Sequence, residues 1–156
     1  MDELPGTMGT SASLALRFGQ CLFSIASLLF MFLGVPFYSF SALCFMMTVM
    51  GLVMAWSLTL VMVDVFSVLI QRPYHQPGII SVVVLGDWVL SFLSLAASCS
   101  TASVAEYLIR SSSPNCSGNL CTRYQLSACM GFFAWFLTLA SALFHLWLLP
   151  KLFPEE

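Results

Sequence analysis

Four long apolar stretches follow one another along the chain, separated by short segments that contain proline, glycine or polar residues. They run from about 14 to 34, 42 to 70, 79 to 109 and 124 to 149. A helix needs about 20 mainly apolar residues to cross roughly 30 Å of hydrocarbon. Each stretch is long enough, so the pattern predicts an all-α membrane protein, with residues 1–156 forming a single domain of four spanning helices.

Small and weakly polar residues recur every three or four positions within these stretches, a spacing that places them on one face of a helix. The series are Arg17, Gln20, Ser24 and Ser27 in the first stretch; Asp87, Ser91, Ser94, Ser98 and Thr101 in the third; and Gly131, Ala134 and Thr138 in the fourth. Small residues at this spacing let membrane helices approach closely. We therefore expect them to pack helices together, and a polar pathway between the helices is the alternative.

Four ionisable residues, Arg17, Asp64, Asp87 and His145, lie towards the same face of the membrane if four spans run up and down. An unpaired charge inside the bilayer costs about 2.5 kcal/mol or more. Arg17 and Asp87 each begin a polar series, and a guanidinium can hold a carboxylate through two parallel hydrogen bonds. We therefore predict an Arg17–Asp87 ion pair. Two acids then face one permanent cation, which leaves open whether His145 is protonated, Asp64 reaches interfacial water, or one acid keeps its proton.

The composition narrows the function. Apolar residues make up 60% of the chain and charged residues 8%, whereas about a quarter of a soluble domain is charged. A soluble enzyme is thereby excluded, and a net charge of −2 offers no basic surface for nucleic acid. The sequence contains no metal-ligand spacing, phosphate-binding glycine loop or nucleophile motif. We expect no catalytic activity, bound metal or cofactor, and the lipid bilayer is the predicted environment.

The segment 111–122, between the third and fourth stretches, indicates the orientation. It carries Cys116 and Cys121, which are close enough to pair, and a glycosylation sequon at Asn115. Disulfides and glycans belong to the non-cytosolic side, although a sequon can also occur by chance. The side that holds both termini carries three basic residues against two on the other, which favours cytosolic termini.

The run 86–97 (GDWVLSFLSLAA), together with four spans and an early arginine, resembles the CASP-like proteins of land plants, in particular their fifth subgroup. These proteins are relatives of the Casparian strip membrane domain proteins. The resemblance implies a MARVEL-like four-helix bundle in the plasma membrane, with both termini cytosolic. It also implies homodimers or higher homo-oligomers, and hetero-oligomers with related four-span proteins.

The resemblance extends to particular residues. The family's arginine and aspartate match Arg17 and Asp87, and its paired outer-loop cysteines match Cys116 and Cys121. The best-known members build membrane platforms that exclude lateral diffusion and gather cell-wall-modifying enzymes. Here the segment between the first two stretches is very short, unlike that of the strip-forming members. We therefore expect a general, non-enzymatic scaffold. The alternative is a solute or ion pathway that uses Asp64, Asp87 and His145.

Overall fold

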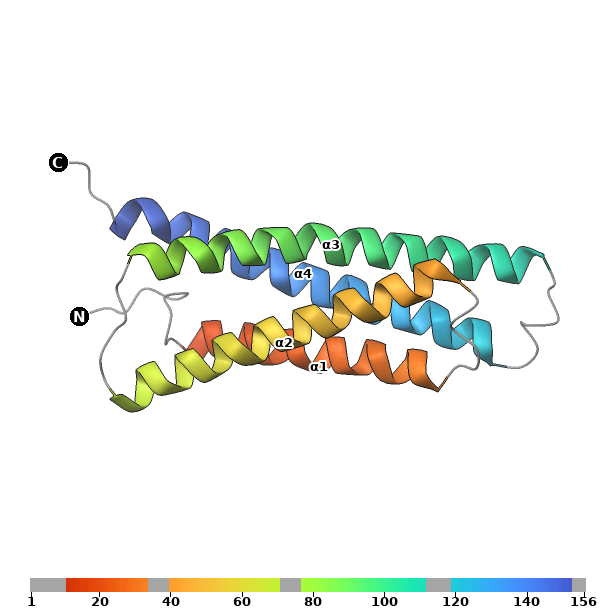
Figure 1. Cartoon of the computed structure of the whole chain (residues 1–156), viewed down its shortest axis with the longest axis horizontal. Helices are drawn as coiled ribbons and strands as arrows, with labels where there is room; N and C mark the ends of the chain where they lie inside the picture. The colour runs from red at the N-terminus through yellow and green to blue at the C-terminus, as the bar shows by residue number, and fades with distance from the viewer. Residues whose placement is uncertain (1–10, 34–39, 71–76, 112–118, 153–156) are drawn as a thin grey trace.

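The computed structural model describes residues 11–33, 40–70, 77–111 and 119–152, and these residues form four α-helices (Figure 1). The helices are α1 (Ser11–Phe32), α2 (Ser41–Ile70), α3 (Pro77–Arg110) and α4 (Leu120–Leu152). Each is long and apolar enough to cross a membrane. The predicted all-α membrane protein with four spanning helices is confirmed.

The helix ends differ from the sequence-based boundaries. α3 begins at Pro77 instead of Ile79, because proline fits the first turn of a helix, where its missing N–H is not needed. α4 begins at Leu120, so the expected loop 111–122 is shorter than predicted. It also continues through Pro150, where we expected it to stop. Pro150 lies in the last turn, so the single hydrogen bond that it removes does not break the body of the helix.

The helices form a closed ring in which each packs against its neighbour in sequence, and α4 packs against α1. α1 and α3 are therefore opposite each other across the interior. We call the end where α1 begins and α4 ends the terminal end, and the other the far end; the terminal end is on the left of Figure 1. α3 and α4 pack most extensively and α2 and α3 least, and α2 crosses obliquely and diverges from α3 towards the terminal end (Figure 1).

The outer surface of the bundle is apolar. On α1, the exposed residues include Phe18, Leu22, Leu29 and Phe32, whereas the polar residues from Ser13 to Ser27 are buried. The bilayer imposes this arrangement, because lipid tails solvate apolar side chains and polar groups find partners only inside the bundle.

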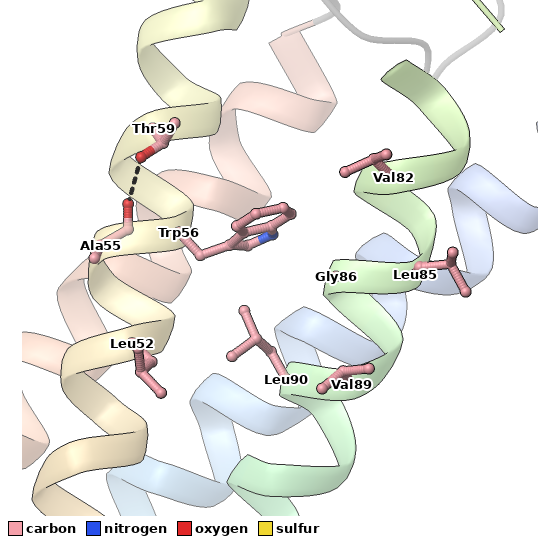
Figure 2. A pocket seen from close by; sticks show the side chains of 9 residues that line it. All are labelled: Leu52, Ala55, Trp56, Thr59, Val82, Leu85, Gly86, Val89 and Leu90. Atoms are coloured by element: carbon pink, nitrogen blue, oxygen red, sulfur yellow. Dashed lines mark hydrogen bonds between the residues drawn. The ribbon is translucent and has the colours of Figure 1, made fainter. Parts of the chain in front are cut away.

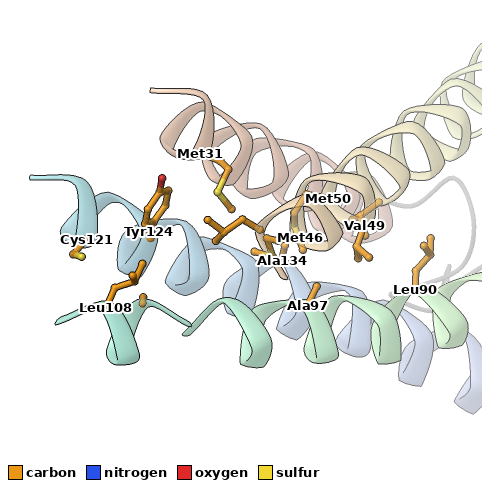
Figure 3. Packing of buried hydrophobic residues seen from close by; sticks show 13 residues of the cluster. Met31, Met46, Val49, Met50, Leu90, Ala97, Leu108, Cys121, Tyr124 and Ala134 are labelled. Atoms are coloured by element: carbon orange, nitrogen blue, oxygen red, sulfur yellow. The ribbon is translucent and has the colours of Figure 1, made fainter. Parts of the chain in front are cut away.

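The interior has a polar half towards the terminal end and an apolar cluster that begins at the far end. The cluster, shown in Figure 3, combines buried side chains of all four helices and extends along α3 as far as Leu90: Met31, Leu43, Met46, Val49, Met50, Val53, Leu90, Ala97, Ala105, Leu108, Cys121, Tyr124 and Ala134. The buried residues Arg17, Asp64, Asp87 and His145 all lie towards the terminal end. This division positions the candidate site.

Candidate functional site

The centre of the polar half is an ion pair between Arg17 of α1 and Asp87 of α3, both fully buried. Arg17 Nη1 donates to Asp87 Oδ1 at 3.3 Å, and Nη2 donates to Oδ2 at 3.1 Å. Because α1 and α3 are opposite each other in the ring, this pair crosses the interior of the bundle. The structure thus brings together the two residues that the sequence paired.

Asp87 also accepts hydrogen bonds from the other two helices. Trp56 Nε1 of α2 donates to Oδ1 at 2.9 Å, and Ser141 Oγ of α4 donates to Oδ2 at 3.3 Å. A buried ion pair is stable only when further hydrogen bonds satisfy its remaining lone pairs. Here one carboxylate receives donors from all three other helices, so it fixes their register relative to α3.

His145 of α4 contacts the same guanidinium nitrogen that binds Asp87. Its Nε2 is 3.1 Å from Arg17 Nη2. A guanidinium N–H can only donate, so a hydrogen bond at this contact requires that Nε2 accepts, as in a neutral imidazole with its proton on Nδ1. Of the alternatives left open by the sequence, this geometry argues against a protonated His145.

The second acid, Asp64 of α2, lies one turn of α1 nearer the terminal end. Ser13 Oγ donates to Asp64 Oδ2 at 3.3 Å, and both residues are buried. The structure therefore places Asp64 against the start of α1, separate from the bonds that connect Arg17 and Asp87.

A groove between α2 and α3 lies directly outside Trp56 (Figure 2). It has a volume of about 540 Å³ and is lined by Leu52, Ala55, Trp56, Thr59, Val82, Leu85, Gly86, Val89 and Leu90. A Cβ atom on Gly86 would lie 2.3 Å from Trp56 Cζ2. Glycine at 86 is therefore what lets the indole lie against α3 and reach Asp87, which gives a physical reason for the Gly86-Asp87 pair of residues in the run 86–97.

The small-residue series pack helices within one bundle. Ser91, Ser94, Ser98 and Thr101 of α3 and Gly131, Ala134 and Thr138 of α4 are all buried. A Cβ atom on Gly131 would lie 2.5 Å from Ser98 Oγ, so α3 and α4 approach closely at this point. Ser98 and Thr138 donate their hydroxyl protons to carbonyls of their own helices, each at 2.8 Å. The small-residue faces of α3 and α4 are therefore buried inside one bundle and are not available for contact with another copy.

A pair of serines joins α1 and α4 further towards the far end. Ser27 Oγ donates to the carbonyl of Ser127 at 3.1 Å, and Ser127 Oγ donates to the carbonyl of Ser27 at 3.0 Å. Beyond this pair the interior face of α1 is occupied by Met31 of the apolar cluster, so the polar series of α1 ends here.

Sequence reasoning missed Trp56 as a partner of Asp87. Counted along the helices, Trp56 is about 21 Å from the end of α2 and Asp87 is about 15 Å from the start of α3. The two residues are therefore expected at different depths in the membrane, and the sequence offered no reason to pair them. The oblique path of α2 brings the two residues together. The available signal was chemical, because a buried tryptophan N–H usually finds an acceptor.

Some predicted features lie outside the described residues. Asn115 and Cys116 belong to the segment 112–118, and only Cys121, buried at the start of α4, is described. The disulfide, the glycan and the orientation of the termini therefore stay predictions. Within the described residues, no group of His, Cys, Asp and Glu could hold a metal ion.

Comparisons with known proteins agree with this architecture. The family model of the Casparian strip membrane protein domain matches residues 6–137. CASP-like protein 5C3 of Arabidopsis thaliana is 49% identical over 152 residues, covering 97% of this chain and 99% of the relative. CASP-like protein 5C1 of Oryza sativa subsp. japonica is 54% identical and covers 94% of each chain, and CASP-like protein 5B1 of Picea sitchensis is 44% identical over 96% of this chain and 81% of the relative.

No solved structure matches the chain, so the MARVEL likeness stays a prediction. The family match covers most of the chain, and the relatives carry names of the fifth subgroup. Four membrane-spanning helices, the run beginning at Gly86 and these full-length similarities lead to one conclusion: the chain belongs to the CASP-like family of proteins with a Casparian strip membrane protein domain.

Proposed function

We propose that the protein is a non-enzymatic scaffold of the plasma membrane, which associates laterally with copies of itself and with related four-span proteins and recruits cell-wall-modifying proteins. Membership of the family supports this function. The saturated hydrogen bonds around Asp87 support it as well, because they hold the four helices in one arrangement and leave neither carboxylate oxygen without a donor.

The observation that carries the proposal is that the polar series on the inward face of α1 ends before the far end. A pathway for ions or polar solutes needs polar groups or water along its whole length, since an unsatisfied polar group in hydrocarbon costs several kcal/mol. The polar series on the inward face of α1 instead ends at the Ser27–Ser127 pair, and Met31 of the apolar cluster follows it on the same face. A fixed structural body therefore fits this interior better than a transport pathway.

The contacts between copies would use the outward faces. The small-residue series of α3 and α4 do not provide these faces, because they are buried within one bundle. The outward residues are large and apolar, as Phe18 and Leu22 on α1 illustrate. In a bilayer such faces associate through van der Waals packing and lipid entropy instead of the hydrophobic effect.

Subunit counting tests the proposal. The full chain, tagged with a single fluorophore and expressed at low density in a plant plasma membrane, should bleach in several steps per spot, with a tagged monomeric membrane protein as control. Proximity labelling from the same tag should recover related four-span proteins together with wall proteins. Spots that bleach in a single step, as those of the monomeric control do, would contradict the scaffold. Ion or solute flux in liposomes above that of empty liposomes would favour the pathway.

The proposed orientation has its own test. With cytosolic termini, the segment that holds Asn115 and Cys116 would face the cell exterior. Treatment with an endoglycosidase should then increase the gel mobility of the wild-type protein and leave that of Asn115→Gln unchanged. A membrane-impermeant maleimide should label Cys116 and Cys121 from outside only after reduction. Labelling of these cysteines from the cytosolic side alone would reverse the proposed orientation.

A further inference from the structure

Three neighbouring polar groups on the inward face of α1 have no hydrogen-bond partner within the part of the chain that the structure describes. They are Arg17 Nε, Gln20 Nε2 and Ser24 Oγ, and each of these residues is at most 1% exposed. The other polar atoms of Arg17 and Gln20 are occupied, since Arg17 Nη1 and Nη2 bind Asp87, and Gln20 Oε1 accepts from Ser57 Oγ at 2.9 Å. The three orphaned groups therefore belong to side chains that are otherwise held in place.

Buried polar groups in proteins are almost always hydrogen-bonded to protein or to ordered water. A single buried group without a partner would be an isolated exception. Here three such groups follow one another along one face of α1, and we call Arg17 Nε, Gln20 Nε2 and Ser24 Oγ the row. The spacing from Arg17 to Gln20 to Ser24 is three and then four residues, which places the three side chains next to one another on one face of α1. Small molecules bound along this face would lie beside all three.

The chemistry of the row restricts the ligand. Arg17 Nε and Gln20 Nε2 can only donate, so they cannot satisfy each other, and the ligand must accept. An anion would do so, but the charge of Arg17 is already balanced by Asp87. An anion here would therefore leave an uncompensated negative charge in the interior, which is strongly unfavourable. A neutral molecule with two lone pairs and two protons matches both the donors and the hydroxyl of Ser24.

We propose that ordered water molecules bind along α1 between Arg17, Gln20 and Ser24 as a constituent of the folded bundle. The row stops before the Ser27–Ser127 pair, where the hydroxyls bond directly to the opposite helix. The bound water therefore forms an internal site that stabilises the polar half, and it does not continue into the apolar cluster. This inference rests on the interior geometry alone and is independent of the proposed scaffold function.

Water-edited NMR of the full chain in lipid nanodiscs tests this site without a substitution. With nitrogen-15 in glutamine, arginine and tryptophan side chains, magnetisation should pass from water to the Gln20 amide protons and to the Arg17 Nε proton, despite their burial. Trp56 Nε1, which donates directly to Asp87 at 2.9 Å, is the internal control and should receive several-fold less. Loss of the resonance in Gln20→Met assigns the amide signal.

A pair of matched variants identifies the hydroxyl that holds the water. Ser24→Ala should reduce the transfer to the Gln20 amide at least about twofold, because one ligand of the bridging molecule is removed. Ser98→Ala is the control, since the Ser98 hydroxyl is equally buried but donates to the carbonyl of Ser94. Transfer unchanged by Ser24→Ala would overturn the proposal. The proposal would also be overturned if the Gln20 amide of the wild type received no magnetisation from water. That result is expected if the Gln20 side chain instead turned its oxygen directly to Arg17 Nε.

Discussion

Replacing Arg17 by alanine should destabilise the bundle more than any substitution on its surface. The change removes the donors at 3.3 Å and 3.1 Å from Asp87 and the donor at 3.1 Å from His145 Nε2. Asp87 keeps the bonds from Trp56 and Ser141, but its negative charge remains buried without a cation.

The magnitude follows from these contacts. A hydrogen bond to a charged group contributes about 1.5–3 kcal/mol, and Arg17 makes two such bonds to Asp87. Removal of one member of a buried ion pair costs about 3–5 kcal/mol, which agrees with the sum of two bonds near the lower end of that range. A loss of about 3–5 kcal/mol lowers the equilibrium constant for folding by about two to three and a half orders of magnitude. Typical folded domains are stable by only about 5–15 kcal/mol, so we expect much of the variant to be retained in the secretory pathway.

Reversible unfolding in bicelles, followed by steric trapping, measures the free energy of unfolding, and surface biotinylation measures delivery. Arg110→Ala is the matched control, because Arg110 also pairs with an acid, Glu106, at 2.8 Å, but the side chains are 79% and 64% exposed. Solvent screening reduces the value of such a pair on a helix to about 0.3–0.5 kcal/mol. Combining Arg17→Ala with Asp87→Asn removes the orphaned charge and should recover about 0.5–3 kcal/mol relative to the sum of the two single changes.

Two results would refute this reasoning. The first is an Arg17→Ala variant that unfolds at the same free energy as Arg110→Ala, because the buried pair would then contribute no more than an exposed one. The second is a double variant whose loss equals the sum of the single losses, because Arg17 and Asp87 would then not interact energetically.

Three further substitutions, the first with a matched control, test the packing and the interior. Gly86→Ala places a methyl group within 2.3 Å of the Trp56 ring and should lower the free energy of unfolding by about 1–3 kcal/mol. Gly51→Ala is the control, because a Cβ at this position meets no atom within 4 Å, and it should raise the free energy of unfolding by up to about 1 kcal/mol through helix propensity. Equal effects of the two changes in thermal unfolding would show that the Trp56 contact does not restrict residue 86. Ser27→Ala should lower the free energy of unfolding by about 0.6–1.7 kcal/mol, the range of interhelical hydrogen bonds in membranes, and an unchanged value in the same bicelle assay would show that the Ser27 hydroxyl contributes nothing to the contact between α1 and α4. Thr101→Val replaces a buried hydroxyl that has no hydrogen-bond partner among the residues that the structure describes, and it should raise the free energy of unfolding by about 1 kcal/mol. A loss of that size would show that the hydroxyl makes a hydrogen bond in the folded protein.

The comparison of sequence and structure is clearest at the ion pair. In hydrocarbon, few alternatives exist for a charged residue, so Arg17 and Asp87 could be matched from depth and helix face alone. The partners of that pair could not, because Trp56 and Ser141 reach Asp87 through the tilt of α2 and the side-chain rotamers of α4, neither of which is encoded in a periodic pattern. The neutral state of His145 likewise required the position of the guanidinium.

The sequence by itself determined the number of spans, their approximate limits and the inward direction of the polar faces, because the bilayer demands about 20 apolar residues per crossing and excludes unpaired polar groups. Only the tertiary structure decided that α4 continues past Pro150, and that the small-residue faces of α3 and α4 meet each other within one chain instead of facing a second copy. A helix face carries no record of which neighbour it will contact. That choice depends on how four helices fill space around a common interior, where the approach of Gly131 to Ser98 and of Gly86 to Trp56 selects one arrangement of the ring.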